Sequence, residues 1–268
     1  YEMSASLVGS EMCIRDSVET IDLCFSYPDS PPALNGVSLR ITHGESVAVV
    51  GGNGAGKSTL LLHLNGLLTP SSGQVRVGDI PVTPKTVARV RESVGMVFQQ
   101  AEDQLFMPTV REDVAFGPLN MGLPPEEIRR RVEQALRNVH AEALADKMTH
   151  HLSGGEKRAV SIATVLSMSP DILVLDEPSA NLDPASRRTL ISLLRQFTHT
   201  KIIATHDLDM VMDLCTRCIV MKDGSILADA PVPDIFADRS LLEEARLEQP
   251  LSYLLMRQER QRNNSGAS

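Results

Sequence analysis

The sequence lacks an excess of basic residues, long hydrophobic runs and a cysteine framework. Its 26 Lys and Arg against 34 Asp and Glu give a formal net charge of −8 at pH 7. This balance argues against a nucleic-acid partner, because nucleic-acid-binding surfaces carry a basic stripe. No apolar run approaches the roughly 20 residues of a membrane-spanning helix, so any membrane attachment must come through another subunit.

The four cysteines show no disulfide framework, which fits a reducing cytoplasm. Cys215 and Cys218 form a single C-x-x-C pair without a second pair elsewhere. We therefore expect them to pack at the junction of a helix and a strand rather than to bind a metal or exchange electrons.

The two ends of the chain differ from its centre. Residues 1–17 have no hydrophobic periodicity and no signal-peptide core, and residues 6–17 resemble a translated sequencing adapter. We expect residues 1–17 to be a non-native leader. Residues 251–268 end in a polar, glycine-containing stretch that predicts a flexible tail. The folded domain is predicted to span residues 18–250.

Two kinds of strand pattern follow one another along the chain. Apolar residues alternate with polar ones at Ile21, Leu23 and Phe25, and again over residues 37–41, which predicts half-buried antiparallel strands. Continuous apolar runs over residues 47–50, 172–175 and 202–204 instead predict parallel strands buried on both faces.

Residues suited to a chemical role follow each of the three buried runs. The first run leads into a glycine-rich loop at Gly51, the second ends at Asp176 and Glu177, and the third is followed by His206. In open α/β sheets, ligands bind outside the carboxyl ends of the strands. We therefore expect these three stretches to meet in one crevice.

A helical segment separates the first two runs. Pro124 and the acids after it suit the start of a helix, and apolar residues then recur at helical spacing. This stripe predicts ordinary core packing; it comprises Ile128, Val132, Leu136, Val139 and Leu144. Residues 101–168 are thus predicted to form a mostly helical subdomain inserted in the sheet domain.

The loop after the first buried run fits the phosphate-binding pattern G-x-x-x-x-G-K-[ST] over residues 51–58. Glycines permit the close approach and the positive φ angles that a phosphate cradle requires. We expect the backbone N–H groups of residues 54–58 to hold the phosphates, Lys57 to lie against the β- and γ-phosphates, and Ser58 to offer its hydroxyl to Mg²⁺.

Two adjacent acids, Asp176 and Glu177, end the second buried run. Adjacent carboxylates at a strand end are costly unless a cation or a proton offsets them. Asp176 is predicted to hold a water on Mg²⁺, and Glu177 to face the attacking water. A second phosphate-recognition sequence, Leu152-Ser153-Gly154-Gly155-Glu156, lies about a hundred residues after the first.

Together these motifs resemble the nucleotide-binding subunit of an ABC transporter over roughly residues 18–245. The resemblance implies an α/β fold, a P-loop NTPase of the ABC ATPase type. It implies a mostly parallel core sheet, an N-terminal antiparallel β subdomain and an inserted helical subdomain. No second phosphate loop is present, so the chain holds one nucleotide-binding domain.

The resemblance also implies a role for each motif. Glu177 matches the general base, His206 the histidine that contacts the γ-phosphate, and Gln99 the glutamine that senses Mg²⁺ and water. Asp183 matches the residue that reaches across a dimer interface, and Ser153, Gly154 and Gly155 read the nucleotide of the opposite subunit. Residues implied to contact ATP are Tyr27, Gly51, Asn53, Gly54, Ala55, Gly56, Lys57, Ser58, Thr59, Ser153, Gly154, Gly155 and Asp183. Residues implied to serve Mg²⁺ are Ser58, Gln99 and Asp176.

Some of these positions are open to other interpretations. Tyr27 matches the aromatic that stacks on adenine, but it also fits an ordinary edge-strand tyrosine. A lone histidine such as His206 is weak support without its neighbours. Gly52 stands where many members of the family have proline or a bulkier residue, and we expect no loss of ATP binding from that difference.

Residues 94–117 resemble the energy-coupling-factor ATPases, and within that group the subunits of cobalt and nickel importers. This implies an active ATPase that uses ATP and Mg²⁺ at the cytoplasmic face of the cell membrane. Its implied partners are membrane-embedded subunits and a second ATPase, identical or paralogous.

Three other functions stay open. The first is an ATPase of a vitamin importer. The second is a soluble mechanical ATPase acting on DNA or ribosomes, although tandem domains, a coiled-coil insert and basic arms are missing from the sequence. The third is a nucleotide-binding regulator without turnover, which Glu177 and His206 disfavour.

Overall fold

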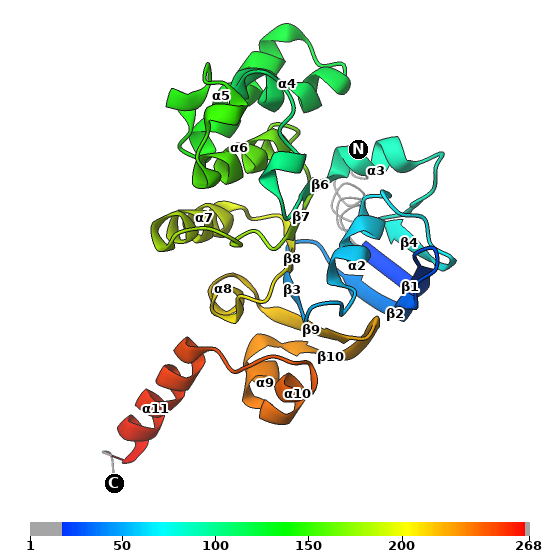
Figure 1. Ribbon diagram of the computed structural model, residues 1–268, viewed down its shortest axis with the longest axis vertical. Helices are drawn as coiled ribbons and strands as arrows, with labels where there is room; N and C mark the ends of the chain where they lie inside the picture. Colours follow the sequence, from blue (N-terminus) through cyan, green and yellow to red (C-terminus); the bar gives the residue numbers. More distant parts are fainter. Residues whose placement is uncertain (1–17, 266–268) are drawn as a thin grey trace, which may run out of the picture.

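The structure is a computed structural model that describes residues 18–265 (Figure 1). The predicted non-native leader, residues 1–17, lies outside the described residues and stays a prediction.

The N-terminal part is a four-stranded antiparallel sheet in the order β2-β1-β4-β5, as the alternating pattern predicted. Its strands are β1 (Val18–Ser26), β2 (Pro32–Ile41), β4 (Ser72–Val77) and β5 (Ile80–Pro81). One detail differs from the expected alternation, because Ile21 is exposed while Thr20 is buried. The register of β1 shifts beside Asp22, whose φ of 46° is in the left-handed region, and this irregularity turns Ile21 outward.

The core sheet has six strands in the order β10-β9-β3-β8-β7-β6. Only β10 runs antiparallel to its neighbour, so the mostly parallel sheet is confirmed. The strands are β3 (Ser46–Val50), β6 (Val94–Val97), β7 (Ile172–Asp176), β8 (Thr200–Ala204), β9 (Arg217–Lys222) and β10 (Ser225–Pro231).

The core sheet separates two hydrophobic cores, because successive side chains of a strand point to opposite faces. Val47 and Val49 of β3 join the core beneath the antiparallel sheet. Ala48 and Val50 join the core shared with the helices on the other side. Every residue of β3, β7 and β8 is buried, which explains why these strands read as continuous apolar runs.

Helices surround the sheet and build a separate helical region. Helix α2 (Lys57–Leu64) follows β3, and α3 (Val87–Ser93) precedes β6. The helices α4, α5 and α6 lie together at one end of the molecule (Figure 1), within the predicted range 101–168. They are α4 (Val110–Asn120), α5 (Pro125–Asn138) and α6 (Gly154–Leu166), with 3₁₀ turns η1 (Ala101–Asp103), η2 (Glu142–Leu144) and η3 (Thr149–His151).

The remaining helices follow the later strands. They are α7 (Pro184–Gln196), α8 (Leu208–Leu214), α9 (Val232–Ala237), α10 (Arg239–Glu244) and α11 (Leu251–Ser265). Where the sequence predicted a flexible tail, the structure has α11, which extends away from the sheet (Figure 1). Its flexibility stays a prediction. Across residues 18–265, no helix combines the length and the apolar character needed to span a membrane.

Cys215 and Cys218 are both buried free thiols. Burial raises the pKa of the Cys215 thiol to about 12, so the thiolate needed for metal binding or exchange is disfavoured. Nor does the described part of the chain hold a group of three or more His, Cys, Asp or Glu side chains that could bind a metal ion. These observations support packing as the role of the pair.

Candidate functional site

The phosphate loop joins β3 to α2 and is held tightly against the strands beneath it. A Cβ on Gly51 would lie 2.3 Å from the Met221 carbonyl oxygen, and one on Gly56 would lie 2.6 Å from that of Ala33. Both glycines have positive φ, 153° and 100°. Gly54 also has a positive φ of 79°, but the space beside it is open. The loop is therefore packed on one side and free on the other, which suits an incoming phosphate.

Lys57 holds its ammonium group at this loop. Its Nζ donates hydrogen bonds to the carbonyl oxygens of Gly51 at 2.8 Å and Gly52 at 3.3 Å. Because the side chain is buried, the position of this positive charge is fixed next to the free side of the loop. A fixed cation beside converging N–H groups attracts a polyphosphate.

A cavity of about 380 Å³ opens over the loop. Tyr27, Gln99 and Glu177 meet the loop there, although they come from distant parts of the sequence. Its lining residues are Tyr27, Ala33, Asn53, Gly54, Ala55, Gly56, Lys57, Ser58, Thr59, Gln99 and Glu177. Thus most residues predicted to contact the nucleotide share one cavity.

Tyr27 lies just beyond β1 and lines this cavity. Its hydroxyl is 3.3 Å from Thr59 Oγ1, and its ring packs edge-on against Phe25 with centroids 4.9 Å apart. The residue is 40% exposed, so part of it remains accessible at the cavity. Stacking on adenine stays a prediction that this placement permits.

Asp176 ends β7 with an incompletely satisfied carboxylate. The side chain is only 5% exposed, and its Oδ1 has no hydrogen-bond partner. Burial raises the pKa of Asp176, and nearby Glu177 raises it further, while a hydrogen bond with Ser58 opposes both effects. A buried, unpaired carboxylate oxygen beside a hydroxyl is a donor set that Mg²⁺ prefers. Asp176 and Ser58 therefore fit the predicted metal site.

Glu177 is fixed by residues that follow β8. Its Oε2 accepts hydrogen bonds from Thr205 Oγ1 at 3.2 Å and from the His206 N–H at 3.3 Å. His206 Nδ1 lies 2.8 Å from the same oxygen. The backbone of Glu177 has a φ of 45°, and such left-handed residues concentrate at functional sites. Glu177, after β7, and His206, after β8, are thus in direct contact, but Glu177 lines the cavity over the loop and His206 does not.

The Ser153 loop forms the start of α6. The Ser153 N–H donates to Glu156 Oε2 at 2.7 Å, and the Glu156 N–H donates to Ser153 Oγ at 3.3 Å. This reciprocal capping satisfies two backbone donors. The space beside the Cα of Gly154 is open, whereas a Cβ on Gly155 would lie 2.8 Å from Ser186 Oγ.

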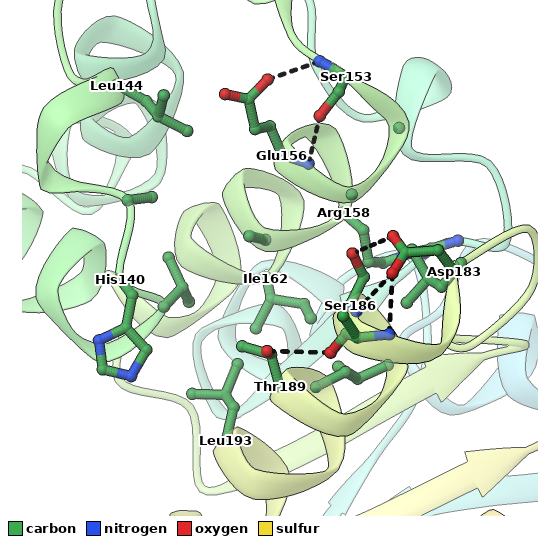
Figure 2. Close-up of a pocket in the computed structure, with 18 of the residues that line it drawn as sticks. His140, Leu144, Ser153, Glu156, Arg158, Ile162, Asp183, Ser186, Thr189 and Leu193 are labelled. Atoms are coloured by element: carbon green, nitrogen blue, oxygen red, sulfur yellow. Dashed lines mark hydrogen bonds between the residues drawn. The ribbon is translucent and has the colours of Figure 1, made fainter.

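A second cavity of about 550 Å³ lies between α6 and α7, and Figure 2 shows Ser153, Glu156, Asp183 and Ser186 around it. Ser153, Gly154, Gly155 and Asp183 line this cavity rather than the one over the phosphate loop. One chain therefore does not bring all its predicted ATP contacts together.

Asp183 acts locally as the cap of α7. Its Oδ1 accepts from the N–H groups of Ala185 at 2.8 Å and Ser186 at 3.1 Å, and Ser186 Oγ donates to Oδ2 at 2.6 Å. These bonds, led by that of the Ser186 side chain, lower the pKa of Asp183. Its predicted reach across a dimer interface stays a prediction.

Two supporting arginines were missing from the sequence-based prediction. Arg187 donates to both carboxylate oxygens of Asp207 at 2.6 and 2.7 Å, which ties α7 to the residue after His206. Arg158 of α6 donates to the carbonyl oxygens of Phe98 and Gln99. These contacts join residues 20 to 60 positions apart, and no local motif announces such pairs.

Comparison with known proteins identifies the family. Residues 34–180 match the ABC transporter family, and the chain belongs to it. The chain is 63% identical over 235 residues to a Geobacter sulfurreducens protein named as an ABC transporter ATP-binding protein, covering 88% of this chain and 94% of that protein. It is 46% identical over 238 residues to the energy-coupling factor transporter ATP-binding protein EcfA of Methanocaldococcus jannaschii, covering 87% and 85%.

Solved structures agree. The structure of cbiO1 from Clostridium perfringens, described as part of the ABC transporter complex cbiONQ, superimposes with a TM-score of 0.75 at 41% identity. That match covers 90% of this chain and 98% of cbiO1. A dimeric bacterial ABC transporter cassette matches with a TM-score of 0.73 at 28% identity, covering 80% and 98%. The predicted family, fold class and ATPase activity are thereby confirmed.

Proposed function

We propose that this ABC ATPase drives import of cobalt or nickel ions through separate membrane subunits, from the cytoplasmic face of the membrane. That the chain is an ATPase of the energy-coupling-factor kind already follows from its relatives. The proposal that the substrate is cobalt or nickel is supported by the similarity to cbiO1 over nearly the whole chain. It is also supported by the resemblance of residues 94–117 to the ATPases of cobalt and nickel importers.

The cavity over the phosphate loop supports hydrolysis as well as binding. Lys57 and the N–H groups of the loop hold the phosphates, and Glu177 orients and deprotonates the attacking water. Thr205 and His206 keep the Glu177 carboxylate in place through the contacts described above. When bound by Ser58 and Asp176, Mg²⁺ supplies positive charge that neutralises the phosphate oxygens. Gln99 lines the same cavity, where it can sense the nucleotide.

The separation of the two cavities supports a dimer. Ser153, Gly154, Gly155 and Asp183 surround a cavity that does not include the phosphate loop. Two chains arranged head to tail would bring the Ser153 loop of each against the nucleotide of the other. The open N-terminus of α6 would then face a γ-phosphate, which its helix dipole favours. The second chain is an identical copy in this proposal, or a paralogue.

An exposed aromatic surface supports a membrane partner. Phe106 is 62% exposed and stacks edge-on against Phe116, with ring centroids 4.8 Å apart. Both rings line a cavity of about 220 Å³ between β6 and α4, and Leu119 is exposed nearby on α4. Exposed apolar patches of this kind mark interaction sites. We propose that an amphipathic helix of a membrane subunit packs on these aromatic side chains. A mechanical ATPase acting on nucleic acid would instead present a basic surface.

Two measurements test the proposal. Glu177→Gln should bind ATP with a Kd within about twofold of the wild type but hydrolyse it at least ~100-fold more slowly. Equal turnover in both proteins would refute the assigned base.

The tagged Glu177→Gln chain, held in ATP, can then be recovered from detergent-solubilised membranes and its partners identified by mass spectrometry. Recovery of a cobalt- or nickel-type membrane set without a second ATPase supports the proposal. Recovery of a vitamin-binding subunit with a paralogous ATPase would show that the imported substrate is a vitamin and not a metal ion. The absence of any membrane partner would favour the soluble mechanical ATPase.

A further inference from the structure

Arg158 is a buried charge that none of the steps above uses. It lies on α6, its residue is 5% exposed, and its Nη1 donates to the Phe98 carbonyl at 2.6 Å. Its Nη2 donates to the carbonyl of Gln99. The planar guanidinium thus bonds two successive carbonyls directly after β6 through two nitrogens held in a fixed fork, whereas the shorter lysine side chain has a single nitrogen for both. Gln99 is the residue that reaches the ATP cavity.

Gln104 fastens the same segment to the same helix. Its Oε1 accepts the Phe98 N–H at 3.3 Å. Its Nε2 donates to the Ser161 carbonyl at 2.6 Å and to Thr164 Oγ1 at 2.7 Å, both on α6. Phe98 is therefore tied to α6 through both its N–H and its carbonyl group. We call this arrangement of Arg158 and Gln104 on residues 98–99 the clasp.

Charge as well as hydrogen bonding holds Arg158 in place. Burial lowers the pKa of Arg158, while the negative charges of Glu102 and Asp176 oppose that effect. The positive charge of the guanidinium therefore interacts with the negative charge of Asp176, the residue predicted to serve Mg²⁺. A buried cation with fixed partners occupies one position rather than several, so it can transmit a displacement.

The clasp and the Ser153 loop belong to one rigid element. Ser153 caps α6, and Arg158 lies on the same helix little more than one turn further along (Figure 2). A helix moves as a unit over such a distance. Any shift of the Ser153 loop toward a nucleotide must therefore move residues 98–99, unless the clasp breaks.

We infer that Arg158 is a positioning residue that couples the two ATP sites of the dimer. When the Ser153 loop engages the nucleotide of the second chain, Arg158 carries that movement to Gln99 at the ATP site of its own chain. Occupation of one site thereby prepares the other for hydrolysis. This inference rests on the proposed head-to-tail dimer and adds to it a route between the sites.

The test compares Arg158→Lys with a matched control, Arg131→Lys. Arg131 also donates to a backbone carbonyl beside α6, from Nη1 to Met168 at 3.0 Å, but at the far end of the helix. ATPase rate is measured against ATP concentration, ATP affinity is measured on the monomer with a fluorescent ATP, and ATP-dependent dimerisation is measured by sedimentation in the Glu177→Gln background.

We expect wild type and Arg131→Lys to show a Hill coefficient clearly above one. In Arg158→Lys it should fall to about one and kcat by roughly tenfold, within the usual range of coupling between sites. The monomer should still bind ATP with a Kd within about twofold of the wild type, because the phosphate loop is untouched. A purely structural role for Arg158 would weaken binding and stability together and leave cooperativity unchanged.

The outcomes separate this inference from the proposed function. If the Glu177→Gln chain does not dimerise with ATP and wild type shows no cooperativity, the proposed dimer fails and the coupling with it. If the Glu177→Gln chain dimerises but Arg158→Lys remains as cooperative as wild type, or wild type itself has a Hill coefficient of one, the coupling alone is overturned. Should Arg158→Lys fail to fold, Gln104→Met opens the clasp from its other side. It must reduce the Hill coefficient in the same way, and unchanged cooperativity in it would overturn the inference.

Discussion

Replacing Asp176 by asparagine should stabilise the protein while removing its response to Mg²⁺. In the structure Asp176 is buried and its Oδ1 lacks a partner. The pKa of Asp176 is raised above its ordinary value of 3.8, chiefly by burial. The folded state therefore binds a proton more tightly than the unfolded state. As the pH rises above that ordinary value, the free energy of unfolding decreases, and the penalty is fully present once the folded carboxyl has ionised.

The magnitude follows from the cost of a buried, unsatisfied group. Leaving a buried polar group without a partner costs about 1 to 3 kcal/mol, and more when the group is charged. Asp176→Asn still leaves one polar atom unpaired, but it removes the charge and keeps an oxygen near Ser58. We therefore expect the free energy of unfolding at neutral pH to rise by about 1 kcal/mol or more. For a domain of this size, each kcal/mol corresponds to a Tm increase of roughly 2 to 4 °C.

Thermal unfolding is measured under three conditions: in EDTA, with ATP alone, and with ATP and Mg²⁺. The first condition reports the gain in stability, and the comparison of the other two reports the response to Mg²⁺. Ligand binding adds about 2.7 kcal/mol of stability when the free ligand is a hundredfold above its Kd. Wild type should gain more from ATP with Mg²⁺ than from ATP alone, whereas Asp176→Asn should gain equally from both. A variant that is less stable than wild type in EDTA, or that keeps the full Mg²⁺ increment, would refute the role assigned to Asp176.

Two further predictions concern residues that support the site: the Arg187–Asp207 ion pair and the glycines of the phosphate loop. Burial raises the pKa of Asp207, but the hydrogen bonds from Arg187, the Met210 N–H and Ser179, together with the charge of Arg187, outweigh it and hold the pKa below 3.8. This contribution to stability is therefore complete above that value and is lost as the pH falls below it. Arg187→Met should abolish this acid-dependent part and cost about 1 to 3 kcal/mol of unfolding free energy, checked by urea unfolding at several pH values, and an unchanged pH profile would contradict it. Gly56→Ala should lower the Tm more than Gly54→Ala. Both substitutions cost about 1 kcal/mol in left-handed backbone strain, but only Gly56→Ala adds a Cβ 2.6 Å from a carbonyl oxygen. Equal Tm losses in thermal unfolding would contradict this, because they would show that the residues packed under the loop move aside.

The strands that carry the site were predictable because burial on both faces leaves a continuous apolar run. The runs that became β3, β7 and β8 are fully buried, and each leads to the predicted polar residue. The phosphate loop was predictable for a different reason. Its glycines are required by backbone geometry, which a short motif records in the sequence itself.

Features that depend on long-range contacts could not be predicted in this way. The outward turn of Ile21 follows from a register shift in β1, where the local pattern still alternates. The clasp of Arg158 on residues 98–99 joins segments about 60 residues apart, and a lone arginine in a helix carries no sign of such a partner. The helix α11 occupies a segment whose composition predicted flexibility, because composition reports the lack of a core and not the backbone conformation.

The prediction that the ATP contacts come from two chains rested on the family resemblance and not on the residues themselves. Nothing in the sequence of the Ser153 loop states that it serves a second chain. In the structure, the separation of Ser153 from the cavity over the phosphate loop gives that prediction a physical basis.

The central claim is that the Ser153 loop completes the ATP site of another chain. The most direct measurement adds Ser153→Arg to Glu177→Gln and determines, by sedimentation in ATP and Mg²⁺, whether the protein dimerises, alongside the ATP affinity of the monomer. We expect Glu177→Gln alone to form dimers and the double variant to remain monomeric. The ATP Kd of the double variant should change by no more than about twofold, since Ser153 lies outside the cavity over the phosphate loop. A double variant that still dimerises with ATP, or one whose monomer loses ATP affinity, would contradict the account.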